Sequence, residues 1–136
     1  MAKGTLLYSS TADDTADPGQ ATRFVARILD AVTAIHKVHL MTTGPGSFAA
    51  HEALGEAYSD LEEGVDNLAE SFMGCNETPL AFPGIDASRW SAEVRAIYEF
   101  IEENRAMMGN ESHIQNLVDD VLDKLARQLF KLDRLA

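Results

Sequence analysis

The sequence predicts an all-α protein and, more closely, a four-helix bundle. Apolar residues recur at steps of three and four in four separate stretches, which is the period of an amphipathic helix. Glycine, proline and polar clusters separate these stretches, and no stretch has the pattern of a strand. With 136 residues, 46% of them apolar, the chain is long enough for one domain with a single core. Four amphipathic helices that share one core form a bundle.

The first helix is expected from about residue 18 to residue 41. Asp17 is placed to cap it, and Pro18 suits the first turn, where a missing N–H does no harm. Residues 1–16 are mostly small and polar and are interpreted as a flexible N-terminal arm, which leaves residues 17–136 for the bundle. The apolar stripe of this helix consists of Val25, Ile28, Val32, Ile35 and His39.

The second helix is expected from about residue 47 to residue 74, where Gly74 can end it. Its stripe consists of His51, Leu54, Tyr58, Leu61, Val65, Leu68 and Phe72. Before it, Pro45 between two glycines cannot continue a helix and allows a sharp reversal, so the two helices should be antiparallel. Because His39 ends one stripe and His51 begins the next, both imidazoles should lie near the turn and point inward.

The third and fourth helices are expected from about residue 87 to 108 and from about 111 to 134. Their stripes consist of Trp90, Val94, Ile97, Ile101 and Met108, and of Ile114, Leu117, Val118, Val121, Leu125, Leu129 and Leu132. The loop before them, residues 75–86, contains two prolines and reaches roughly 40 Å when extended. That length permits a crossover between helices 2 and 3 that makes them parallel, with a simple up-down bundle as the alternative.

Two inward-pointing histidines at one end of a helix pair suggest a metal site, because neutral imidazole is a common ligand of iron, zinc and copper. The alternative is that His39 and His51 are hydrogen-bonded core residues. Asp66 and Glu70 are four residues apart and share a helix face, which makes them candidate oxygen ligands. For these two carboxylates the alternative is a solvated acidic face.

Distance separates the two pairs of candidate ligands. His51 and Asp66 are 15 residues apart on one helix, which is roughly 22 Å at the rise of an α-helix. One ion cannot bridge that distance, so the carboxylates would have to come from a second copy of the chain. A two-fold dimer with this helix antiparallel to its mate would form two equivalent sites.

The same stretch resembles a known family. It contains His36-Lys37-Val38-His39, Gly44-Pro45, Phe48, His51-Glu52, Tyr58 and Val65-Asp66-Asn67-Leu68-Ala69-Glu70. This run resembles the Dps-type miniferritins (DNA-binding proteins from starved cells), which belong to the ferritin-like superfamily. The resemblance implies a ferritin-like bundle, a dodecameric shell and an iron-oxidation site between subunits. It also implies that His39 and His51 come from one subunit and Asp66 and Glu70 from the other.

The sequence departs from the family pattern at three positions. The acid usually found four residues after the second histidine is Gly55, the aromatic after the first is Leu40, and the arginine after the Ala-Glu pair is Ser71. Gly55 removes one carboxylate ligand, and Ser71 bears on the shell contacts, so that a dimer remains an alternative assembly. The ferritin-type motif with glutamate three residues before histidine is absent, which favours a site between subunits.

These features predict an oligomeric iron-binding protein that acts as a ferroxidase. It would oxidise Fe(II) with peroxide or oxygen, store Fe(III) and protect against oxidative damage, with zinc or manganese as alternative metals. The competing hypothesis is a metal-poor helical oligomer with a structural or interaction role, which Gly55 and Ser71 motivate.

Charge and composition exclude other classes of function. The net charge of −11 disfavours DNA as a partner, because an acidic surface repels phosphates. No apolar run is long enough to span a membrane, and no secretory signal is seen, so a cytoplasmic location is expected. The single cysteine, Cys75, leaves no internal disulfide.

Overall fold

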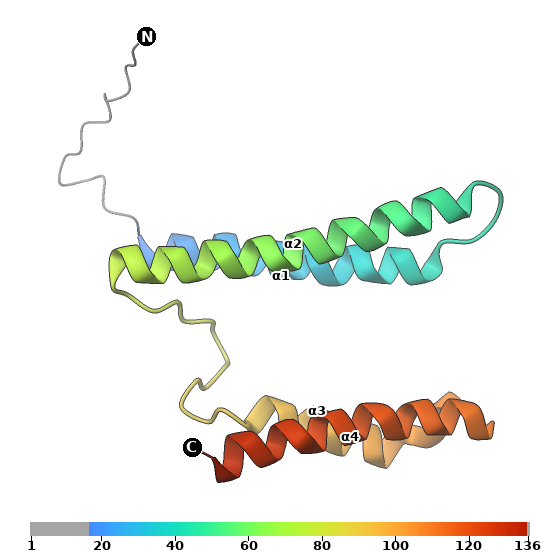
Figure 1. Cartoon of the computed structure of the whole chain (residues 1–136). Helices are drawn as coiled ribbons and strands as arrows, with labels where there is room; N and C mark the ends of the chain where they lie inside the picture. The colour runs from blue at the N-terminus through green and yellow to red at the C-terminus, as the bar shows by residue number, and fades with distance from the viewer. Residues whose placement is uncertain (1–16, 136) are drawn as a thin grey trace. The chain divides into compact units, whose positions relative to one another are not determined.

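A computed structural model of the chain describes residues 17–135, which form four α-helices and one short 3-10 helix without any strand (Figure 1). The all-α prediction is therefore confirmed over this range. The predicted N-terminal arm, residues 1–16, lies outside the described residues. The chain divides after Ile85 into two compact units. Each unit contains one helical hairpin.

The first hairpin consists of α1, Pro18–Met41, and α2, Ser47–Asn76, which lie side by side and antiparallel (Figure 1). The predicted cap is confirmed, because the Asp17 side chain accepts a hydrogen bond of 2.9 Å from the N–H of Gly19. The turn between the helices uses Gly44 and Gly46 at φ of 95° and 77°, where a side chain would be strained.

The end of α2 differs from the prediction. The helix continues through Gly74 to Asn76, and the left-handed residue that ends it is Glu77, at φ of 49°. Asn76 supports this last turn by donating a 2.9 Å hydrogen bond from its side chain to the carbonyl of Phe72. A glycine permits a helix to end but does not require it, and here the chain reverses three residues later.

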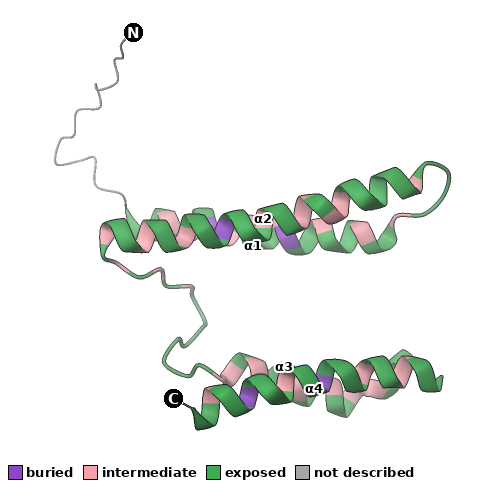
Figure 2. Ribbon diagram, viewed as in Figure 1, coloured by how far each residue is buried: buried purple, intermediate pink, exposed green. Residues whose placement is uncertain are grey.

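The core of this hairpin is small and lies on the predicted stripes. Val25 and Val32 of α1 and Val65 of α2 are buried, the last with 2% of its surface exposed (Figure 2). Thr22 is also buried, and its hydroxyl oxygen accepts a 3.4 Å hydrogen bond from the N–H of Ala81. That bond fastens the segment after α2 to the first turns of α1.

The second hairpin consists of α3, Ala92–Asn104, a 3-10 turn, Arg105–Met108, and α4, Ser112–Arg134. The prediction that the third helix begins near residue 87 is wrong by five residues. Asp86 accepts hydrogen bonds from both the N–H and the hydroxyl of Ser88, at 3.0 and 2.6 Å, and forms a turn instead. Trp90 therefore precedes the helix and is exposed.

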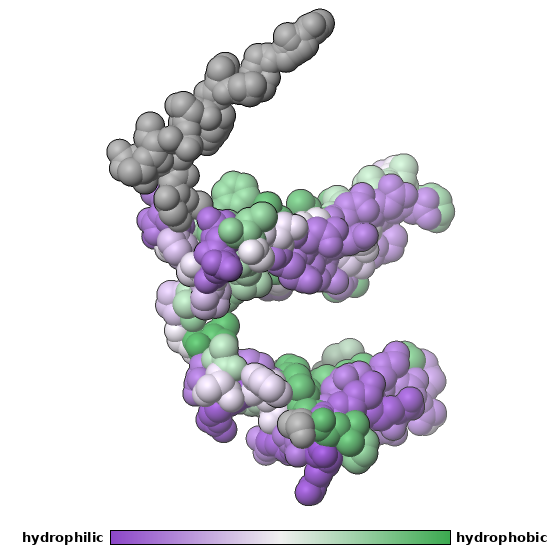
Figure 3. Space-filling model, turned by 60° about the vertical axis from the view of Figure 1, so that its left-hand side comes forward, coloured by the Kyte–Doolittle hydropathy of each residue, from purple (hydrophilic) through white to green (hydrophobic). Residues whose placement is uncertain are grey.

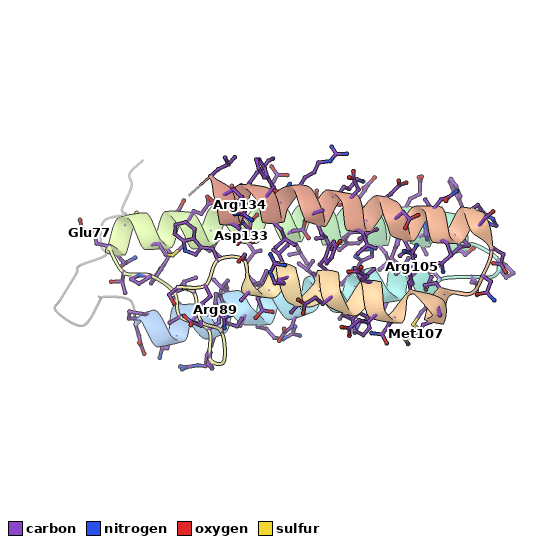
Figure 4. The ribbon with its side chains drawn as sticks, turned by 90° about the horizontal axis from the view of Figure 1, so that it is seen from below. Glu77, Arg89, Arg105, Met107, Asp133 and Arg134 are labelled. Carbon is purple, nitrogen blue, oxygen red and sulfur yellow. The ribbon has the colours of Figure 1, made fainter. Side chains whose placement is uncertain are left out.

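A polar network joins the 3-10 turn to α4. The side-chain amide of Gln115 donates to the carbonyls of Arg105 and Gly109, at 2.9 and 2.7 Å, and its oxygen accepts from Arg105 Nε at 2.7 Å. Arg105 also donates to Asp119 at 2.6 Å. This network lies at the end of the hairpin opposite Asp133 (Figure 4). It satisfies carbonyls that the end of a helix leaves without an N–H partner.

Each hairpin by itself leaves large apolar side chains exposed, and hydrophobic surface is visible on both (Figure 3). Met41 and Phe48 in the first hairpin are 76% and 75% exposed. In the second, only Leu122 and Leu129 belong to the buried core, while Leu117 of the predicted stripe is 58% exposed. No helix within residues 17–135 is both long enough and apolar enough to cross a membrane.

Candidate metal centre

The two predicted histidine ligands lie together beside the turn between α1 and α2. His39 is in the last turn of α1, and His51 is the fifth residue of α2. Their imidazole rings are stacked, with centroids 3.7 Å apart and planes inclined by 26°. His51 is exposed to solvent rather than pointing into a core, and His39 is half-buried. The pair is therefore accessible from outside the hairpin.

Reciprocal hydrogen bonds fix the orientation of both rings. His39 Nδ1 lies 2.8 Å from the backbone carbonyl of His51, and His51 Nδ1 lies 3.1 Å from the carbonyl of His39. A carbonyl oxygen can only accept, so each Nδ1 carries the proton and donates. In the neutral imidazole the other nitrogen, Nε2, then has a free lone pair. Both rings are thus in the tautomer that a metal ligand needs.

Local backbone structure explains why these carbonyls are available. The carbonyl of His39 is near the end of α1, where helical N–H partners run out, and it receives only a 3.4 Å bond from Thr42 within the backbone. The imidazole of His51 supplies a second donor. The His51 imidazole therefore stabilises the end of α1, and the carbonyl at that end orients the imidazole.

Two further aromatic rings pack against the pair. The ring of His36 is stacked on Tyr58 with centroids 4.0 Å apart, and Tyr58 meets the ring of His39 edge-on at 5.4 Å. The periodicity alone predicts Tyr58 as an apolar stripe residue. Its position seven residues after His51, two helical turns along the same face, was the signal that it would neighbour the histidines.

The two predicted carboxylate ligands are not part of this cluster. Asp66 and Glu70 are exposed residues of the same uninterrupted helix as His51. A helical rise over 15 residues leaves roughly 22 Å between the backbones of His51 and Asp66. Among residues 17–135, no three histidine, cysteine or acidic side chains are grouped so that they could hold a metal ion.

Within the described residues, the chain by itself brings together two histidines and no third candidate ligand. Two imidazole nitrogens suit a first-row divalent cation, but most such sites need at least three protein ligands. The donor set fits a metal if a second copy adds oxygen ligands, since His51 and the carboxylate pair are exposed and His39 is half-buried. The fold and this cluster define an all-helical protein in which two hydrogen-bonded histidines lie at one end of a helical hairpin.

The chain belongs to a family of unknown function, DUF5856, whose model matches residues 39–132. The match begins at His39 and includes His51, Asp66 and Glu70. No curated protein and no solved structure matches the chain. Membership of this family assigns no activity, so the resemblance to the Dps-type miniferritins stays a prediction.

Proposed function

We propose that this protein is an oligomeric ferroxidase that binds Fe(II) at a site shared by two copies of the chain. The observation that carries the proposal is the histidine pair, in which both Nδ1 atoms donate to backbone carbonyls and the lone pair of each neutral ring is therefore on Nε2. A histidine that binds a metal through Nε2 needs this tautomer, and a carbonyl acceptor at Nδ1 is the usual partner that fixes it.

In this proposal, His39 and His51 of one chain hold Fe(II), and Asp66 and Glu70 of another complete the site. Imidazole suits Fe(II), and carboxylates suit Fe(III), so a mixed set accommodates the ion before and after oxidation. The electron passes to peroxide or oxygen, and the Fe(III) product is stored. The net charge of −11 draws cations toward the protein surface.

The proposal also includes a ferritin-like bundle with a crossover between α2 and α3. It is supported by the apolar side chains that each hairpin leaves exposed, which a shared core would bury. The 15 residues between Asn76 and Ala92 could extend to roughly 50 Å. The length of α2 is about 45 Å. Native-state hydrogen exchange tests this bundle, because helices of one core should open in one cooperative step.

An anaerobic titration of Fe(II), followed by calorimetry, tests the metal centre. The oligomer mass is measured on the same sample. We expect saturable binding by the wild type and its loss in His39→Ala and His51→Ala. His113→Ala is the matched control, because His113 is an exposed histidine at the start of α4. Fe(II) oxidation at equal rates in the wild type and His51→Ala would refute the ferroxidase.

Mixing two inactive variants tests whether the site is shared. One variant is His51→Ala, and the other combines Asp66→Asn with Glu70→Gln. In a mixed two-fold dimer, one site collects every substitution, and the other collects none. Unfolding and reassembling an equal mixture should therefore restore about a quarter of the wild-type sites. A site within one chain would give no recovery.

The second candidate function is a metal-poor helical oligomer with a structural role. The absence of a three-ligand group within residues 17–135 favours it. The two candidates differ in their response to metal, since a ligand that binds only the native state raises its thermal stability. A melting temperature that stays the same with and without Fe(II), over a range of concentrations, would support the structural role.

A further inference from the structure

We infer that Gly55 is a positioning residue that admits the imidazole of His39 against the backbone of α2. This inference rests on the proposed function, because it concerns a ligand of the same metal centre. Sequence comparison with the resembling family interprets Gly55 as a lost ligand. In the structure, the absence of a side chain at position 55 leaves room for the His39 ring.

The contact is between the His39 ring and the place where a side chain at position 55 would begin. A Cβ atom built on Gly55 would lie 3.3 Å from Cε1 and 3.5 Å from Nδ1 of His39. The first distance is tighter than nine in ten real contacts of Cβ atoms. The ring would have to move by a few tenths of an ångström or turn to another rotamer.

That movement would disturb the hydrogen bond that sets the tautomer. Within α2, the carbonyl of His51 faces the N–H of Gly55, four residues later. Because Gly55 has no Cβ, the same carbonyl stays open to a second donor, and His39 Nδ1 reaches it at 2.8 Å. A side chain at position 55 would crowd the approach of that donor.

The other glycines of α2 show that this use is specific to position 55. A Cβ atom added to Gly64 or Gly74 would have no atom within 4 Å. Glycine is a poor residue for a helix interior at both positions 55 and 64. The two differ in their surroundings, because a side chain would meet the His39 ring at position 55 and no atom at position 64.

The space beside position 55 therefore holds either the His39 imidazole in this orientation or a side chain at residue 55, but not both. An aspartate there would offer a carboxylate but would take space beside the His39 ring. We expect Gly55→Asp to weaken divalent-metal binding rather than strengthen it, and Gly55→Ala to do the same without adding a charge.

The test compares Gly55→Ala with Gly64→Ala, which makes the same chemical change in the same helix where there is room. The first measurement is the ¹⁵N chemical shift of the imidazole nitrogens in the metal-free protein, with His39 assigned through His39→Gln. The wild type and Gly64→Ala should show Nδ1 of His39 protonated. Gly55→Ala should show loss of that single tautomer.

The second measurement is the affinity for Co(II). It should fall by roughly tenfold or more in Gly55→Ala and stay unchanged in Gly64→Ala, in line with the effect of removing a group that orients a ligand. A third measurement needs no metal. In a His39→Ala background, Gly55→Ala should raise the melting temperature as Gly64→Ala does, because the ring that it crowds is gone.

An unchanged His39 tautomer in Gly55→Ala, together with wild-type affinity for Co(II), would overturn the inference while leaving the metal centre intact. A wild type that does not bind Co(II) would instead count against the proposed function. In that case a change of tautomer confined to Gly55→Ala would still support the positioning role. The two failures are thus distinguishable.

Discussion

Replacing Gln115 by alanine should destabilise the second hairpin. The Gln115 side chain makes three hydrogen bonds, two to backbone carbonyls and one with Arg105 Nε. Each is worth about 1 kcal/mol net, and two carbonyls would lose a partner. Partial exposure to water and the higher helix propensity of alanine reduce the sum to about 2 kcal/mol.

Urea unfolding at a fixed protein concentration measures this loss. A decrease of about 2 kcal/mol moves the midpoint down by about 1 M for a protein of this size. The control is Gln128→Ala, which removes the same side chain from an exposed position of α4 and should change little. If both variants unfold at the same urea concentration, the network around Arg105 does not stabilise the hairpin.

Three other predictions concern the cap, the core and the pH dependence. Asp17→Ala removes the cap of α1 and should lower the free energy of unfolding by about 1 kcal/mol, as measured by thermal melting. Val65→Ala should cost about 2 kcal/mol, because Val65 is buried; a loss below a few tenths would mean that the site collapses freely. Hydrogen bonds from the hydroxyl of Ser91 and then from Arg95 hold the pKa of Asp133 below its ordinary value. A depressed pKa in the folded state gives stability at pH above the unfolded value, and it is lost as the pH falls through the folded one. Asp133→Asn should flatten this acid limb of the stability profile.

The position of the histidine pair could be predicted from sequence because it depends on two helix periods and one turn. His39 is the last residue of one apolar stripe and His51 is the first residue of the next. Because glycines and a proline form a tight turn between them, the two histidines should lie beside each other at that turn. Hydrogen bonding of the two rings is the alternative that the sequence offers, but the identity of the partners, the two backbone carbonyls, could not be predicted. These bonds depend on side-chain rotation near a helix end, which periodicity does not describe.

Two errors have local physical causes. Asp86 and Ser88 favour a turn through side-chain hydrogen bonds, and this competes with the helical period that continues back to Trp90. Gly74 is predicted to end α2, but the helix continues two residues further to Asn76, and Glu77 takes the left-handed conformation instead. In both cases the conformational preference of one or two residues competes with the helical period of the surrounding stretch. The sequence alone does not show which of the two determines where the helix begins or ends.

The reciprocal bonds between His39 and His51 have a consequence for the turn that joins their helices. Two rings, each anchored on the opposite helix, act as a clasp that sets the alignment of α1 with α2. The five residues from Thr42 to Gly46 are then relieved of that task and serve only as a tether. Lengthening such a tether costs little, since closure entropy grows slowly with loop length. The turn between α1 and α2 is thus a place where the chain could gain residues while the two helices keep their alignment.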